Sequence, residues 1–289
     1  MNKLHRQMEI DMHLGNYAER TRKVYLDAIC RFEYHFGRPV QEAGVEDIRA
    51  YLHHMVECNL SESSLKHAYS ALKLITEVTL GKALEARRIP KARKKKRLPV
   101  ILSQAEVEAI IDAASSLKYR AIFTTIYSAG LRTSEAAQLK LSDIDSVGMR
   151  IRVDQGKGNK DRFTLLAATT LDLLREYWKT RRPPEWLFTP DATVDRPISE
   201  RSIQGAFLSA LRKTSINKPA TPRSFRHAFA THLYEADYDI QTIQEILGHA
   251  NINTTRIYLH LSKRRLANVR SPIDSWPSSS SQDEQGRSS

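Results

Sequence analysis

The sequence predicts a mainly α-helical protein: a small helical amino-terminal part, then a larger part that is mostly helical with a small antiparallel β-sheet. Three observations support this fold class. Apolar residues recur at spacings of three and four along most of the chain, one short region alternates with a period of two, and a proline-containing basic segment separates two periodic halves. The 289 residues, 41% hydrophobic and 27% charged, suffice for two folded units.

The amino-terminal part is predicted to be a bundle of short helices. Val24, Ile29 and Phe32 follow a helical spacing, a second helix is predicted over 45–58, and a third over 61–80 begins at the capping residue Ser61. No strand pattern competes with these helices before about residue 85, so this part has a helical core.

The larger part begins with a capping box formed by Ser103 and Glu106. A strongly apolar helix is predicted from Tyr119 to Ala129, and Gly130 ends it. Later helices are predicted over 170–179, 199–214, 224–236 and 240–247.

The predicted sheet is a β-hairpin. Ile151 and Val153 alternate with polar residues, residues 156–160 supply turn chemistry with Lys157 at the bend, and residues 162–166 resume an extended pattern. The segment around Asp143 and Asp145 is expected to be a turn from helix to strand.

The charge of the chain predicts a polyanionic partner, either nucleic acid or an acidic membrane surface. The formal net charge is +12, and one segment between the two parts holds eight basic residues and no acid. A solvated or nuclear-localisation-like segment is the alternative, but its position between folded parts favours contact with a DNA backbone. The eight residues are Arg87, Arg88, Lys91, Arg93, Lys94, Lys95, Lys96 and Arg97.

Several other functions are disfavoured by the sequence. Cys30 and Cys58 have no metal-ligand spacing, and no apolar run approaches the roughly 20 residues of a membrane helix, so we expect a cytoplasmic protein without membrane contact. We find no Walker loop and no acid cluster suited to magnesium, and we expect no cofactor and no metal.

The candidate chemistry lies in separated cationic residues and one tyrosine. Tyr258 follows His249 closely, and Arg132, Lys157 and Arg226 precede them. A phenol can attack a DNA phosphate when cations stabilise the transition state. Each residue also has a structural alternative: Arg132 as a partner of Glu135, Lys157 as an exposed turn residue, His249 as a helix cap and Tyr258 as a packing residue.

Together these motifs resemble those of the tyrosine recombinase (phage integrase) family, in particular the short Xer-like integrases and those of insertion sequences. The resemblance covers most of the chain. It rests on Gly130-Leu131-Arg132-x-Ser134-Glu135, the Gly-Lys-Gly-Asn-Lys hairpin, Arg226-His227-x-Phe229-Ala230-Thr231-His232-Leu233, Leu247-Gly248-His249 and Tyr258. The segment from Tyr17 to Tyr25 is similar to the first helix of the family's core-binding domain.

The resemblance implies a role for each residue. Arg132 and Arg226 would bind the non-bridging oxygens of the scissile phosphate, Lys157 would protonate the departing 5′ hydroxyl, and His249 would donate a hydrogen bond to the phosphate. Tyr258 would form a 3′-phosphotyrosine.

One position departs from the family pattern. Arg223 stands three residues before Arg226, where the family has a histidine, and arginine cannot accept a proton. His227 is not expected to replace that histidine, because adjacent helical residues point about 100° apart; it is interpreted as a packing residue.

The implied protein is a site-specific DNA recombinase that clamps duplex DNA. Its expected divisions are a core-binding domain at 1–86, a basic linker at 87–100, a catalytic domain at 101–270 and a disordered tail at 271–289. We expect a homotetramer on two synapsed sites, with residues 259–269 either closing their own domain or docking on a neighbouring subunit. The alternatives are a catalytically impaired DNA-binding accessory protein and a type IB topoisomerase-like enzyme.

Overall fold

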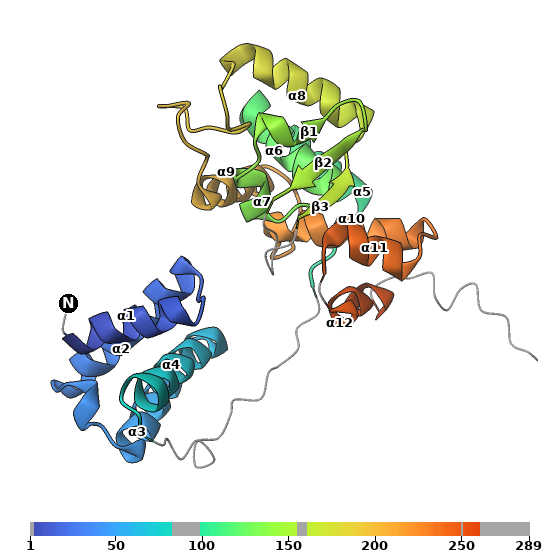
Figure 1. Cartoon of the computed structure of the whole chain (residues 1–289). Helices are drawn as coiled ribbons and strands as arrows, with labels where there is room; N and C mark the ends of the chain where they lie inside the picture. The colour runs from blue at the N-terminus through green and yellow to red at the C-terminus, as the bar shows by residue number, and fades with distance from the viewer. Residues whose placement is uncertain (1–2, 83–98, 155–160, 250, 261–289) are drawn as a thin grey trace, which may run out of the picture. The chain divides into compact units, whose positions relative to one another are not determined.

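The computed structural model of the chain describes residues 3–82, 99–154, 161–249 and 251–260 (Figure 1). The chain divides into two compact units, Met1–Arg97 and Leu98–Ser289. The predicted basic linker residues Arg87 to Arg97, the predicted general acid Lys157 and the predicted tail 271–289 lie outside the described residues. Within the described ranges, every helix is too short or too polar to cross a membrane.

The first unit is the predicted helical bundle. Its elements are α1 (Lys3–Leu14), α2 (Glu19–Phe36), the 3-10 turn η1 (Val40–Glu42), α3 (Val45–Glu57), α4 (Glu62–Leu74) and the π-helical turn η2 (Ile75–Thr79). Ile29 and Phe32 of α2, Ile48 of α3 and Leu72 of α4 are fully buried in one core. Burial of these apolar stripes holds the short helices together, because isolated helices of this length are marginal in water.

Helix α1 was not predicted as a separate element. The segment from Tyr17 to Tyr25, which we expected to be similar to the first helix of the family's core-binding domain, forms the start of α2, the second helix of this chain. Helix α1 buries only His5, Met8 and Met12, so its apolar stripe is too narrow to be recognised from the sequence. Asn16 has a φ of +54°, and this left-handed residue separates the two helices.

The second unit contains most of the helices and the sheet. Its helices are α5 (Gln104–Asp112), α6 (Leu117–Ser128), α7 (Thr133–Ala137), α8 (Ala168–Arg181), α9 (Glu200–Arg212), α10 (Pro222–Glu235), α11 (Ile240–Leu247) and α12 (Ile252–Thr255), with 3-10 turns η4 (Leu141–Asp143) and η5 (Arg256–His260). The four later helices predicted from the sequence are confirmed within two residues at each end.

Helix α10 is anchored in the core of this unit by an aromatic cluster. Phe225 of α10 packs against Phe207 of α9 and Phe123 of α6, with ring centroids 5.1 and 5.9 Å apart. All three rings are fully buried, and the edge-to-face geometry of Phe225 and Phe207 is a favoured one. The cluster therefore fixes α10 against α6, the helix that leads to Gly130.

The sheet has three antiparallel strands in the order β1-β2-β3. Strands β2 (Arg150–Val153) and β3 (Arg162–Leu165) form the predicted hairpin, with Ile151 opposite Thr164. Strand β1 (Ile144–Asp145) occupies the segment that was predicted to be only a turn. A strand of two residues has no periodicity of its own, and only its pairing with β2 defines it.

The aromatic cluster generates a stability prediction. Substitution Phe225→Ala should lower the free energy of unfolding of the second unit by about 3–5 kcal/mol, because it leaves a cavity among fixed rings. Trp178 and Trp186 lie in the second unit and the first unit has no tryptophan, so urea denaturation followed by tryptophan fluorescence reports on the second unit. Leu208→Ala, at an exposed position of α9, is the control and should cost about 0.5 kcal/mol or less. Equal losses for the two variants would contradict the role of the cluster.

Candidate active site

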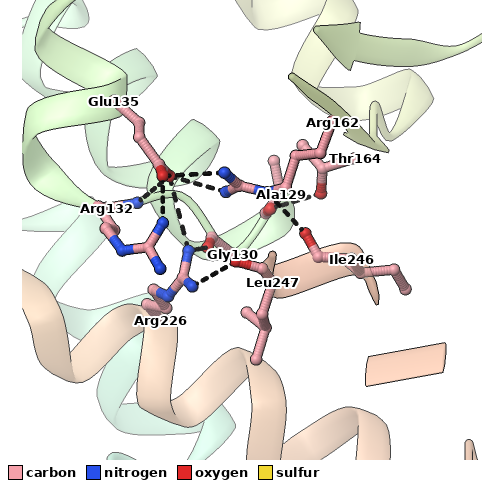
Figure 2. A network of polar contacts seen from close by, with 9 residues as sticks. All are labelled: Ala129, Gly130, Arg132, Glu135, Arg162, Thr164, Arg226, Ile246 and Leu247. Carbon is pink, nitrogen blue, oxygen red and sulfur yellow. Dashed lines mark hydrogen bonds and ion pairs between the residues drawn. The ribbon is translucent and has the colours of Figure 1, made fainter. Parts of the chain in front are cut away.

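The centre of the site is the carboxylate of Glu135, which binds three arginines (Figure 2). Arg162 of β3 donates two hydrogen bonds to it, at 2.9 and 2.8 Å. Arg132 contacts it through its guanidinium and, at 2.8 Å, through its backbone N–H. Nη1 of Arg226 lies 3.6 Å from Oε2 of Glu135. One acid therefore joins the start of α7, strand β3 and helix α10.

Arg226 is held beneath this acid by two backbone carbonyls. Its Nη1 donates to the carbonyl of Gly130 and its Nη2 to that of Leu247, both at 2.6 Å. Gly130 lies just after the end of α6, and Leu247 is the last residue of α11. Backbone oxygens at the ends of helices lack partners within the helix. Arg226 is only 4% exposed, so its guanidinium satisfies groups that water cannot reach.

Gly130 is required where the chain passes between α6 and α7. Its φ is +59°, a conformation that side chains rarely adopt. A Cβ at this position would lie 2.4 Å from Cδ1 of Phe229, a residue of α10. The glycine thus lets the backbone approach α10 closely enough for Arg226 to reach its carbonyl.

The four charged side chains make the site electropositive. Arg132, Arg162 and Arg226 carry three positive charges against one negative charge on Glu135, which leaves +2. Burial opposes ionisation of Glu135, but the hydrogen bonds and charge of Arg162, with Arg132, lower its pKa to about 2. Burial and the charge of Arg132 lower the pKa of Arg226 to about 9. Glu135 and Arg226 are therefore both ionised at neutral pH, and the surplus positive charge of the cluster suits an anion.

Tyr258 of η5 lies beside this cluster. The side chain is buried, with 2% of the residue exposed, and its hydroxyl lies 2.9 Å from Nδ1 of His227. Burial raises the pKa of Tyr258, while the charges of Arg226, Arg223 and Arg132 act in the opposite direction. The phenol is therefore protonated at neutral pH and close to three cations.

His249 stacks on Tyr258 in the loop after α11. The two rings are 6.5 Å apart between centroids, at an interplanar angle of 14°. Nδ1 of His249 lies 2.9 Å from the hydroxyl of Thr255. Burial and the charges of Arg226, Arg132 and Arg162 lower the pKa of His249 to about 3, so the ring is neutral at pH 7. A neutral imidazole still has one N–H to donate.

The structure brings together most of the residues predicted for the site. Arg132, Arg226, His249 and Tyr258 form one cluster, and Arg223 lies nearby on the exposed side of α10. Lys157 and the eight basic linker residues lie outside the described residues, so their predicted roles remain predictions.

Three residues of the cluster and its surroundings were not identified from the sequence as parts of the site: Glu135, Arg162 and His227. The pairing of Arg132 with Glu135 was considered only as a structural alternative, and Arg162 was not considered. His227 was interpreted as a packing residue, and the structure places its half-buried ring against the hydroxyl of Tyr258. The angle of about 100° between neighbouring helical residues does point His227 away from Arg226. However, η5 places Tyr258 on the side of α10 that His227 occupies.

The sequence of the chain is similar to those of known proteins along most of its length. The pattern of the phage integrase family matches residues 101–265, and that of the phage integrase N-terminal SAM-like domain matches residues 4–86. A relative from Sinorhizobium fredii, whose name describes an integrase/recombinase, is 41% identical over 96% of this chain and 90% of its own length. Tyrosine recombinase XerD of Halalkalibacterium halodurans is 33% identical over 78% of this chain and 79% of its own length.

A solved structure agrees on the fold. The crystal structure of the XerH site-specific recombinase, in a post-cleavage complex with its difH substrate, superposes with a TM-score of 0.70. The match is 24% identical and covers 87% of this chain and 79% of that chain. The family patterns and these relatives, rather than the shared fold, define the class of protein: an enzyme that breaks and rejoins DNA strands in site-specific recombination. The chain belongs to the phage integrase family, the tyrosine recombinases.

The ion pairs of Glu135 predict a dependence of stability on pH. Replacing Glu135 with Gln should cost about 3–5 kcal/mol at pH 7, because it leaves buried arginines without their counter-charge. The folded-state pKa lies below the ordinary value of 4.5, so this contribution is present above pH 4.5 and disappears as the pH falls toward 2. Urea denaturation at several pH values should show the gap between wild type and variant closing on acidification.

The control for this experiment is Glu185→Gln, which removes an exposed partner of Lys140. It should change stability by about 1 kcal/mol or less. A cost for Glu135→Gln that is the same at pH 7 and pH 3 would show that charge pairing is not what Glu135 contributes.

Proposed function

We propose that Tyr258 is the nucleophile of this recombinase and that Arg132 and Arg226 bind the phosphate that it attacks. The observation that carries the proposal is the position of the Tyr258 phenol beside a cluster with a net charge of +2. The phenolic oxygen would bond to phosphorus and the bond to the 5′ oxygen would break, which leaves a 3′-phosphotyrosine and a free 5′ hydroxyl.

The charge of the cluster suits the transition state better than the ground state. A phosphodiester carries one negative charge, whereas a phosphorane-like transition state places about two on its non-bridging oxygens. Arg132 is the more accessible of the two arginines, with 26% of its side chain exposed, and Arg226 lies behind it. Glu135 and the carbonyls of Gly130 and Leu247 orient both guanidiniums in advance, so little reorganisation is needed during the reaction.

Two further residues are assigned by the family resemblance. Lys157 would donate the proton that the departing 5′ oxygen needs, and His249 would donate a hydrogen bond to the phosphate. The phosphotyrosine bond retains the energy of the phosphodiester, so a 5′ hydroxyl from another strand can reverse the attack without a nucleotide.

The arrangement on DNA is also a proposal. Residues 1–86 would form the core-binding domain and 101–270 the catalytic domain, and the basic segment at 87–100 would cross the backbone between the two sides of a clamp. Its eight positive charges would bind phosphates and make the affinity fall steeply with salt. XerH and the transposon Tn1549 integrase, which share this fold, have been solved in complex with DNA. Tetramers on two synapsed sites would allow strands to be exchanged, with residues 259–269 docking on a neighbour.

The first test traps the covalent intermediate. On a duplex nicked beside the cleavage position, the short 5′ fragment diffuses away, and wild type should accumulate a covalent adduct that denaturing gels resolve. Tyr258→Phe should bind the same DNA and form no adduct. The control is Tyr238→Phe, which alters an exposed tyrosine after α10 and should form the adduct at the wild-type rate. An undiminished adduct with Tyr258→Phe would refute the assignment, and a wild type without any adduct would favour the accessory-protein alternative.

The second test concerns the general acid. Lys157→Ala should slow cleavage of ordinary DNA by about 10²- to 10⁴-fold, because the 5′ oxygen leaves poorly without a proton. A substrate with sulfur at the 5′ bridging position has a leaving group that needs no proton, so the variant should cleave it at nearly the wild-type rate. Lys160→Ala, in the same sequence motif, is the control. If sulfur fails to rescue Lys157→Ala, Lys157 is not the proton donor.

A further inference from the structure

The hydroxyl of Tyr258 faces several cations and two imidazoles in the part of the chain that the structure describes. Arg223 and Arg226 of α10 and Arg132 at the start of α7 act on it through their charge, and arginine can only donate hydrogen bonds. His249 stacks on the Tyr258 ring, but its Nδ1 faces Thr255. Nδ1 of His227, in contrast, lies 2.9 Å from the Tyr258 oxygen.

We propose that His227 is a catalytic residue that accepts the phenolic proton of Tyr258 when the tyrosine attacks DNA. The proposal rests on Tyr258 being the nucleophile. It assigns to His227 the proton acceptance that Arg223, at the position where the family pattern has histidine, cannot perform.

At neutral pH the two groups are in the protonation states that the transfer requires before it begins. Burial, with the charges of Arg223 and Arg226, lowers the pKa of His227 to about 4, so the ring is neutral at pH 7. Burial raises the pKa of Tyr258, so the phenol holds its proton. When Nε2 of His227 carries the ring hydrogen, Nδ1 has the free lone pair that accepts the Tyr258 O–H.

The geometry of α10 lets one helix place Arg226 in the charge cluster and His227 beside the hydroxyl of Tyr258. Residues 223 and 227 are four apart and lie on the same face, one turn from each other. Arg226 points about 100° away from His227, toward the carbonyls of Gly130 and Leu247. A base at position 227 therefore approaches Tyr258 from the same face of α10 as position 223. Arg226 keeps its own contacts on another side of the helix.

The proposed step is balanced. The Tyr258 O–H bond breaks, its proton passes to Nδ1 of His227, and the electron pair remains on the phenolic oxygen, which bonds to phosphorus. The phosphorus bond to the 5′ oxygen breaks and that oxygen takes a proton from the general acid. The imidazolium formed beside Arg223 and Arg226 is stabilised by the negative phosphate that Arg226 binds. In the reverse reaction His227 returns the proton as the tyrosine leaves.

The test is the single-turnover rate on the nicked suicide substrate. His227→Asn keeps an acceptor near the place of Nδ1 but cannot take a proton, and it should cleave about 10²- to 10⁴-fold more slowly, with DNA affinity unchanged. The wild-type rate should fall on acidification, as Nδ1 becomes protonated, and the His227→Asn rate should lack this dependence.

The chain offers a closely matched control. His232 lies on the same helix, and its Nδ1 is also 2.9 Å from a tyrosine hydroxyl, that of Tyr127 rather than Tyr258. His232→Asn should cleave at the wild-type rate. His227→Asn at or above the wild-type rate would overturn the proposal, because it would show that His227 merely holds Tyr258. A wild type without adduct would instead refute Tyr258 as nucleophile, and His227 with it.

A rescue experiment separates proton transfer from structure. In the His227→Asn background, Arg223→His should restore much of the lost rate, because it places an imidazole on the same face of α10. Arg223→Gln in that background should restore nothing. Equal restoration by His and Gln would contradict proton acceptance as the function that the first substitution removed.

Discussion

The structure of the site depends on the ionised carboxylate of Glu135. Its bonds to Arg132, Arg162 and Arg226 connect α7, β3 and α10, three elements that are distant in the sequence. Buried arginines need a counter-charge, and a single carboxylate supplies it while leaving a surplus of +2 for a phosphate. Stability and the positive charge of the cluster therefore both depend on Glu135. A second acid would pair the arginines more fully, but it would reduce the surplus positive charge that suits an anion.

Helix α10 connects this charge cluster to Tyr258. Its Phe225 fixes it in the aromatic core, its Arg226 caps the carbonyls that follow α6 and end α11, and its His227 meets the hydroxyl of Tyr258. The helical angle of about 100° per residue lets the two adjacent side chains point to different groups, Arg226 to the carbonyls of Gly130 and Leu247 and His227 to the hydroxyl of Tyr258. A small rotation of α10 would disturb both contacts at once, so the packing of α10 in the core keeps both in place.

Much of the fold and part of the site could be predicted from the sequence. The long helices have regular apolar stripes, and the β2–β3 hairpin has alternation with turn residues, so local pattern sufficed. Helix α1, the five-residue α7 and strand β1 could not be predicted, because each is too short or too narrowly buried to show a period and exists through its tertiary contacts. Among the site residues, Arg132, Arg226, His249 and Tyr258 stood out through the family resemblance.

Periodicity was enough to predict the class of fold, and the resemblance of the motifs was enough to predict the family and its cationic residues. Which of these groups contact one another depends on how distant segments pack together. Glu135 meets Arg162, which is 27 residues away in the chain, and His227 meets Tyr258, which is 31 residues away. Contacts of that kind arise from packing, and no local pattern records them.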